Sequence, residues 1–507
     1  MVLRYSVLTA LVGLLLLGGL GFTRFETGSM QDRQSPIEVS KETTVYTEPL
    51  DENGYLLVVE ALRRHSSEGV TRENNAAVLW LEAIGFRAEG TVLDYQAEQL
   101  GSEIPPDDAS FFRHGTPQPG PLDVFLPLEQ LERVNQGPWG ADECPEAAEW
   151  IEENEAALAL VAEAVKRPRF YVPREGDHSW SLLLPDVQSS RSVARCLIAR
   201  AYLRMEQSDY EGAWDDILTT YRLGRMSAKG AFLIESLVGV AIDSMAQQAT
   251  SKWLETLPVM APDLEKCLAE YDALGPIPRL ADKVQNERLM LVDLANFVSQ
   301  GNTLEDWPGL GAQMMVLFRR RIDWNLVLRE AGGRYDRMGE IFAVQDPERR
   351  RELMAEFEEE LRESNDAVQA KYENAGGIAL QLFSGREEAS KDVAVIFTGL
   401  IMPASAAILH AEDRSDTARQ MTRLAFAIKA YQLEHGEFPA SLDDLSDAGR
   451  SMPEGERSGV YPLTYRVNDE EVVLYQFGRN GEDDGGPPND AAMPDASDDQ
   501  GWRWRLR

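Results

Sequence analysis

The fold class is decided by residues 187–223, which read VQSSRSVARCLIARAYLRMEQSDYEGAWDDILTTYRL. Apolar residues recur every three or four positions on both sides of the polar segment Gln207-Ser208-Asp209, which is the spacing of a buried helix face. Small residues such as Ala201 and Ala213 let two helices approach each other closely. The stretch therefore predicts a hairpin of two helices, over residues 187–204 and 210–223.

This hairpin looks like a single tetratricopeptide unit. Leu197, Ala201 and Tyr202 fit the first helix of that family, and residues 209–214, from Asp209 to Trp214, fit the start of the second helix. No second copy follows at a fixed period, so a solenoid of true repeats is not expected. An irregular helical domain and a solenoid-like domain without sequence repeats both remain open.

Helical patterns extend from the hairpin in both directions, over about residues 60–391. They predict a helix over residues 74–86, one over 146–166 and a charged surface helix over 346–366. The expected fold class is mainly α, with a large helical domain over residues 51–391 and a long helical segment over 392–435. Residues 393–409 carry no charge and form either a buried core helix or a short membrane segment.

Composition limits the partners. The 507 residues carry a formal net charge of −35, which repels nucleic acid and anionic lipid head groups, so no nucleic-acid binding is expected. The three cysteines, Cys144, Cys196 and Cys267, contain no CxxC pair. Their number and spacing argue against a disulfide framework and against a structural zinc site.

The N-terminal segment indicates a membrane location. Residues 7–22 are free of charge and rich in leucine, with Arg4 before them and Arg24 after them. Such a segment is either an uncleaved anchor or a removed signal peptide, and we favour the anchor because no small-x-small cleavage site follows. We therefore predict a signal anchor over residues 1–24 and a linker over 25–50. The expected location is the bacterial inner membrane, with the bulk of the chain in the periplasm.

Catalytic signals are weak. The sequence contains no HExxH, Walker, GxSxG or dinucleotide-binding motif. His178 is the most suggestive of the five histidines because Asp177 and Ser179 flank it, although a structural histidine is the expectation. The arginine pairs Arg191/Arg195 and Arg200/Arg204 form either an anion site or ion pairs with acidic neighbours, and we expect ion pairs.

The last hundred residues carry a different pattern. An amphipathic helix is expected from an N-cap at Ser415 to Gly436, and Pro439 prevents its continuation. A short helical turn after Pro439 and three strands are expected next, the strands over residues 463–467, 471–477 and 501–506. These elements predict a small α+β domain with a β-sheet over residues 436–507.

Residues 415–507 resemble the C-terminal domain of the type II secretion major pseudopilins. They also resemble planctomycete-type membrane-anchored proteins in which such a tail follows a helical domain. The residues that carry the resemblance are Ala430-Tyr431, Gly436, Phe438-Pro439, Leu442, Pro462 to Tyr465, Leu474 to Gly478, Asn480-Gly481, Gly485-Gly486 and Asp498-Asp499.

The resemblance implies a calcium-binding loop. Calcium takes six to eight oxygen ligands from carboxylates, amides and backbone carbonyls, and glycines let such a loop turn inward. The candidate ligands are Asn480, Asp483, Asp484, Asp490, Asp498 and Asp499. The alternative is an acidic, glycine-rich surface loop without a metal.

These observations predict a non-enzymatic protein. The expected function is a membrane-anchored extracytoplasmic scaffold or protein-interaction module, linked to type II secretion-like or envelope assembly and acting on protein partners. The alternative is an envelope hydrolase with an unrecognised site in the helical domain. A pocket that unites His178 or His114 with carboxylates would favour the hydrolase.

Overall fold

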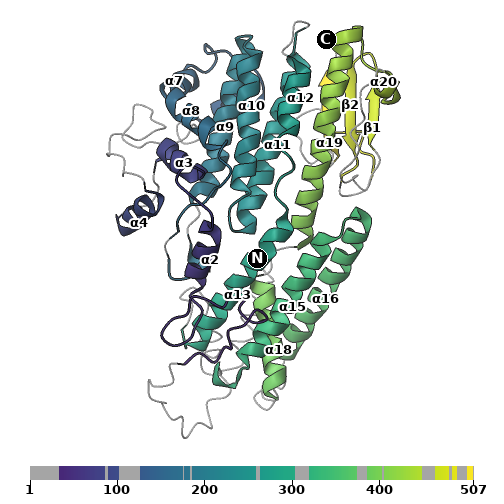
Figure 1. Cartoon of the computed structure of the whole chain (residues 1–507). Coiled ribbons are helices and arrows are strands. Elements are labelled where there is room, and N and C mark those ends of the chain that lie inside the picture. Colours follow the sequence, from purple (N-terminus) through teal and green to yellow (C-terminus); the bar gives the residue numbers. More distant parts are fainter. Residues whose placement is uncertain are drawn as a thin grey trace.

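The computed structural model describes residues 34–85, 90–101, 126–174, 176–182, 185–258, 263–302, 319–373, 385–401, 405–447, 463–478, 482–487 and 499–505. Within these ranges the protein is an elongated stack of helices with a small sheet at the side of one end (Figure 1). The mainly α prediction is confirmed. The predicted membrane anchor lies outside the described residues, and none of the helices within them has the length and hydropathy to cross a membrane.

Two buried clusters of apolar residues form the interior. Core 1 contains Leu197, Ile217, Trp253 and Phe426, and occupies the end of the molecule that carries the sheet. Its helices are α3 (Ala76–Ile84), α6 (Leu128–Gln136), α7 (Pro145–Glu153), α8 (Glu155–Ala164), α9 (Pro185–Glu206), α10 (Tyr210–Ser227), α11 (Leu233–Thr256), α12 (Leu264–Asp272) and part of α19 (Ser405–His435).

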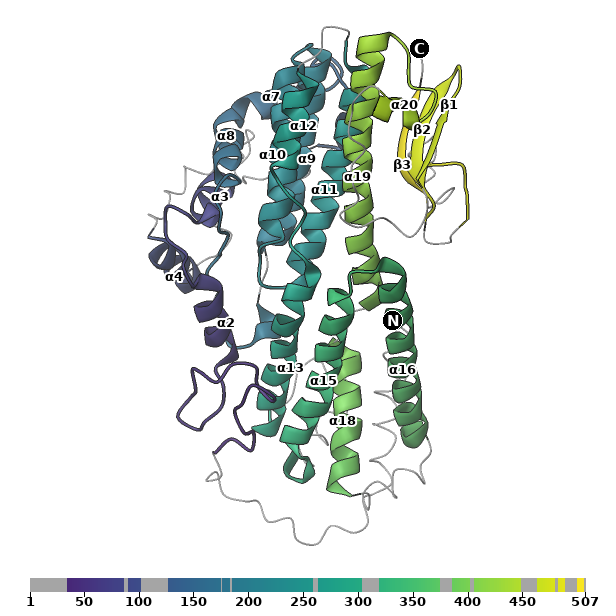
Figure 2. The ribbon, with the colours of Figure 1, turned by 45° about the vertical axis from the view of Figure 1, so that its right-hand side comes forward.

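Core 2 occupies the other end and contains Val292, Leu328 and Phe397. Its helices are α2 (Val58–Ser67), α13 (Val284–Ser299), α15 (Trp324–Ala343), α16 (Pro347–Glu373) and α18 (Arg386–Ile401). Both views place α13 beyond the end of α11, so the cores stack along the long axis (Figure 2). Shorter elements add single residues: α4 (Gly90–Leu100) and α20 (Asp443–Asp447) add Leu100 and Leu445 to core 1, and the 3-10 turn η2 (Leu280–Lys283) adds Leu280 to core 2. Two further 3-10 turns are η1 (Ser179–Ser181) and η3 (Arg319–Arg321).

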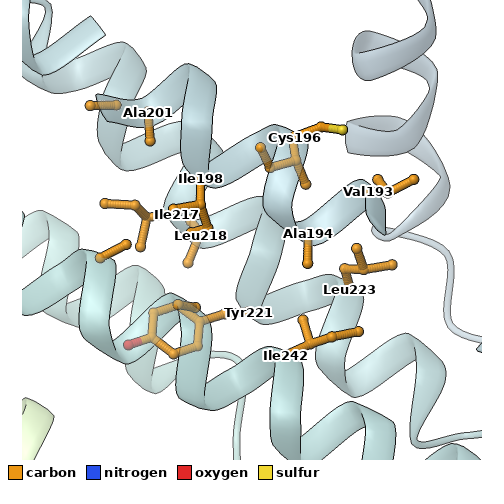
Figure 3. Packing of buried hydrophobic residues seen from close by; sticks show 14 of the residues in the cluster. Val193, Ala194, Cys196, Ile198, Ala201, Ile217, Leu218, Tyr221, Leu223 and Ile242 are labelled. Carbon is orange, nitrogen blue, oxygen red and sulfur yellow. The ribbon is translucent and has the colours of Figure 1, made fainter. Parts of the chain in front are cut away.

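The predicted helical hairpin forms, as α9 and α10. Ser208 makes the turn with a φ of 64°, and the carboxylate of Asp209 accepts the backbone N–H of Gly212 at 2.9 Å, which caps α10. The apolar faces of α9, α10 and α11 then pack together, with Ile198 and Leu218 between them (Figure 3). Helices α10 and α11 lie close together at Gly224 and Gly239, where a Cβ on Gly239 would lie 2.5 Å from the Gly224 carbonyl oxygen.

The expected helix over residues 146–166 is two helices. α7 ends at Glu153 and α8 begins at Glu155, with Asn154 between them. The Asn154 side-chain amide is buried and donates to the Trp150 carbonyl at 2.7 Å. An asparagine that binds the backbone of the preceding turn competes with helix continuation, which accounts for the break.

Helix α19 joins the two cores. Ile408 and Leu409 lie in core 2, whereas Leu424 and Phe426 lie in core 1. The predicted N-cap at Ser415 is wrong, because the buried residues before Ser415 extend the helix back to Ser405. Its predicted end is confirmed, since α19 stops at His435 and Gly436 takes a φ of 79° that favours glycine.

The uncharged segment 393–409 belongs to α18 and α19 in its described parts. Val393, Ala394 and Phe397 of α18 are buried in core 2, together with Ile408 and Leu409. This burial favours the core helix over the membrane segment. The two helices are separated by residues 402–404, which are outside the described ranges.

The C-terminal sheet is antiparallel, in the order β1-β2-β3. The strands are β1 (Thr464–Val467), β2 (Glu471–Gln476) and β3 (Gln500–Arg505), close to the predicted ranges. Trp502 pairs with Leu474 and Trp504 with Val472, so the apolar side chains share one face. That face packs on core 1, and the Trp504 indole N–H donates to the Ser251 carbonyl of α11 at 3.2 Å.

Candidate functional site

The predicted calcium ligands lie in the connection between β2 and β3. Asp483, Asp484 and Asp499 are described. Asn480, Asp490 and Asp498 lie outside the described residues. Within the described ranges, no three His, Cys, Asp or Glu side chains are grouped closely enough to hold a metal.

Asp499 organises the described part of this loop. It precedes β3, and its Oδ1 accepts the backbone N–H of Gly478 at 3.1 Å. Its Oδ2 accepts the N–H groups of Asp484 at 3.0 Å and Gly486 at 2.8 Å. Asp499 is 5% exposed, so these three bonds satisfy a carboxylate that has lost most of its water. One carboxylate thereby ties both sides of the connection together.

Asp483 makes a second set of contacts in the same loop. Its Oδ1 accepts the Tyr475 hydroxyl at 2.7 Å and the Gly485 N–H at 3.0 Å, and its Oδ2 pairs with Arg466 at 2.8 Å. The Tyr475 hydrogen bond lowers the pKa of Asp483 below its usual value. The structure thus brings Asp483 and Asp499 to one loop, where both carboxylates bind protein groups.

His178 meets a carboxylate from a distant part of the chain. Its Nδ1 lies 3.2 Å from Oδ1 of Asp293 on α13. The Asp293 Oδ2 accepts the Ser179 backbone N–H at 2.6 Å and the Ser179 hydroxyl at 2.9 Å. Burial raises the pKa of Asp293. The imidazole ring stacks on Trp180 at 4.4 Å and meets the edge of Phe297 at 4.9 Å.

The chemistry of this cluster differs from a nucleophilic serine site. A nucleophilic serine donates its hydroxyl proton to histidine, and the carboxylate holds the opposite side of the imidazole. Here Ser179 donates to Asp293, the same carboxylate that His178 contacts. The cluster fixes the turn η1 against α13, which is the role expected of a structural histidine.

The arginine pair on α9 is used for ion pairing, as expected. The Arg200 guanidinium donates to both oxygens of Asp216 on α10, at 2.6 Å and 3.0 Å. Arg204 contacts the same carboxylate at 3.0 Å, and Arg200 also pairs with Glu155 at 2.7 Å. Asp216 is 2% exposed, so the charges lie inside the helix interface. These contacts favour the ion-pair interpretation over an anion site for Arg200 and Arg204.

Lys429 has a lowered pKa and was not predicted from the sequence as a candidate residue. It lies on α19 and is 4% exposed. Burial lowers its pKa to about 8, and the nearby Glu255 offsets part of the effect. The available signal was its position one helical turn after the buried Ala425, within an apolar stripe. A lysine with a lowered pKa is a candidate reactive amine, and it also costs stability when protonated.

We expect Lys429→Met to stabilise the protein at pH 7, by on the order of 1–3 kcal/mol. The folded-state pKa, about 8, lies below the ordinary value of 10.5. The contribution of Lys429 to stability is therefore full above pH 10.5 and is lost as the pH falls through 8. Thermal melts between these pH values should show a flatter profile for the variant. Lys391→Met, at an exposed lysine paired with Glu387, is the control. A lower melting temperature for Lys429→Met at pH 7 would contradict the assignment.

Two polar clusters thus lie outside the ion-paired helix interfaces just described. One is the loop held by Asp499 and the other is the His178–Asp293 pair. Comparison of the chain with family models, with curated proteins and with solved structures gave no match.

Proposed function

We propose that the protein is a membrane-anchored extracytoplasmic scaffold or protein-interaction module that serves type II secretion-like or envelope assembly. The observation that carries the proposal is a set of buried ion pairs among the described residues. Charged side chains inside the helical body pair across helix interfaces and so fix the relative positions of the helices. Three such pairs are Arg200–Asp216, Arg225–Asp243 and Arg350–Asp413.

The partner is a protein with a basic surface. Helix α16 buries Met354, Phe357 and Val368 and turns outward a face rich in carboxylates, several of which pair with arginines. The exposed carboxylates on that face are Glu352, Glu356, Glu359, Glu360, Glu363 and Asp366. In a chain of net charge −35 this face attracts cationic surfaces, and the association weakens as salt rises.

Site-specific crosslinking in cells tests the proposal. A photoreactive residue at Glu356 or Glu363 should capture one basic protein, whereas one at the exposed Glu211 of α10 should not. The double variant Glu356→Lys/Glu363→Lys should reduce capture at Glu359 several-fold, because it removes two of the six exposed carboxylates and adds two positive charges to the face. Equal capture from α16 and α10, or no specific product, would contradict the assignment of this face.

A hydrolase is the second candidate, and the contact between His178 and Asp293 favours it. A fluorophosphonate probe labels serines that a histidine activates. Because Ser179 donates to Asp293, we expect no labelling of the intact protein. Labelling of Ser179 that disappears in His178→Ala would support the hydrolase over the scaffold.

We also propose that the loop between β2 and β3 binds calcium. Its candidate ligands are those that the pseudopilin resemblance implies, and calcium should stabilise the native loop if it binds there. Melting of the whole protein should occur several degrees higher in about 1 mM calcium than in chelator. Asp484→Asn removes an exposed carboxylate whose backbone N–H still binds Asp499, so it should reduce this difference and leave the melt in chelator unchanged. Identical melts, with no calcium retained in elemental analysis, would contradict the proposal.

A further inference from the structure

A cavity of about 410 Å³ lies where core 1 and core 2 meet. Its walls come from α2, from residues 168–174, from the start of α11 and from η2 with the start of α13. One part of the wall is apolar and includes Val59, Leu62, Phe170 and Phe232. A cavity of this size accommodates a small organic molecule.

The polar part of the same wall is cationic. Arg63, Arg169, Arg174, Lys229 and Lys283 line the cavity, and Glu235 is the one carboxylate among its lining residues. A positively charged wall is unexpected in a chain whose net charge is −35. An excess of cations around a concave site concentrates anions there, because the low-dielectric walls focus the field.

The one carboxylate that lines the cavity, Glu235, already binds groups of the protein. Glu235 pairs with Arg174 at 2.5 Å, and its other oxygen accepts the Phe232 N–H at the start of α11 at 2.8 Å. The next N–H of α11, from Leu233, is bound by Glu287 at 2.8 Å. An incoming anion would therefore be held by side-chain cations, and the start of the helix adds no free donor at these two positions.

Lys229 and Arg169 are held in place by neutral groups. The Lys229 ammonium donates to the Pro168 carbonyl at 3.0 Å, and the Arg169 guanidinium donates to the Glu68 carbonyl. Within the described residues neither side chain forms an ion pair with a carboxylate. Both residues are exposed to solvent, yet partial desolvation lowers the pKa of Lys229, and the positive charge of Arg169 lowers it further. The two cations are therefore oriented but not neutralised.

We propose that this cavity binds an organic anion with an apolar part. Its phosphate or carboxylate group lies against Lys229 and Arg169, and its apolar part lies against Phe170 and Phe232. This ligand site goes beyond the proposed scaffold function and does not depend on it. Recognition by cations makes the affinity sensitive to salt, and the apolar wall makes an aromatic anion bind better than a bare ion.

Calorimetric titration of the whole protein tests the site with four probes: phenyl phosphate, benzoate, inorganic phosphate and benzyl alcohol. We expect phenyl phosphate or benzoate to bind with a Kd at or below about 1 mM, and both inorganic phosphate and neutral benzyl alcohol to bind at least about tenfold more weakly. A preference for phenyl phosphate assigns a phosphate ligand, and a preference for benzoate assigns a carboxylate. Either preference supports the proposal.

Lys229→Met should weaken binding of the preferred probe at least about tenfold while leaving the melting temperature without ligand nearly unchanged. Arg169→Lys keeps the charge and should retain most of the affinity, whereas Arg169→Met should not. Lys391→Met, at an exposed lysine of α18, is the matched control and should bind as the unaltered protein does. The proposal is overturned if no probe binds at about 10 mM, or if Lys229→Met and Arg169→Met bind as tightly as the unaltered protein.

Discussion

Asp216→Asn should lower the free energy of unfolding by about 3–5 kcal/mol. Asp216 is 2% exposed and is the carboxylate that faces the buried Arg200 guanidinium between α9 and α10. Asparagine keeps the shape of the side chain but removes the charge, so Arg200 would stay buried without its main counter-charge. Removing one partner of a buried ion pair costs far more than the intact pair contributes. Urea denaturation, followed by circular dichroism, measures the loss.

Glu155→Gln is the matched control for this substitution. Glu155 binds the same guanidinium at 2.7 Å, but its side chain is 51% exposed, so its loss should cost less than about 1 kcal/mol. The double variant Arg200→Met/Asp216→Leu removes both charges and should recover much of the stability. Equal losses for Asp216→Asn and Glu155→Gln would show that burial does not set the strength of this interaction.

Trp253→Ala should also lower the free energy of unfolding by about 3–5 kcal/mol. The Trp253 ring is fully buried on α11 and lies 5.1 Å from the Trp214 ring of α10 and 6.1 Å from the Phe426 ring of α19. Its indole N–H donates to the Tyr210 carbonyl at 3.0 Å. Alanine therefore leaves a cavity where three helices meet, and it also removes the indole hydrogen bond to the Tyr210 carbonyl.

Trp253→Phe separates these contributions. It keeps an aromatic ring in core 1 and loses the indole donor, so it should cost clearly less than Trp253→Ala. Denaturant unfolding and near-ultraviolet circular dichroism should both rank the three proteins in this order. A loss for Trp253→Ala below about 1 kcal/mol would mean that the surrounding helices collapse into the space.

The sequence predicted those parts of the fold that depend on local order. The α9–α10 hairpin follows from helical periodicity around a polar turn, the end of α19 from Gly436, and the three strands from alternation. Prediction from the sequence failed where tertiary packing determines the bounds of a helix. Ser415 has the chemistry of an N-cap, but the burial of Ile408 and Leu409 in core 2 extends the helix through it.

In the candidate sites, too, local sequence predicted some residues, whereas contacts that depend on tertiary packing were not predicted. The pseudopilin resemblance pointed to Asp483 and Asp499, yet the partners of Asp499 could not be read from spacing, because the chain must first bring Gly478 and Gly486 to it. The cationic cavity was missed altogether. Its charges come from segments far apart in the chain, and periodicity indicates which face of a helix is apolar but not which faces meet.

The order in which the chain visits the two cores has a consequence for biosynthesis. Core 1 begins with α3 and is completed by α19 and by Trp504 near the C-terminus, while α13, α15, α16 and α18 of core 2 lie between them in the chain. A ribosome therefore delivers the last side chains of core 1 only after it has made nearly all of core 2. The apolar surface of α10 and α11 that Phe426 covers stays open until then, so the nascent chain needs protection from aggregation between the synthesis of α11 and that of α19.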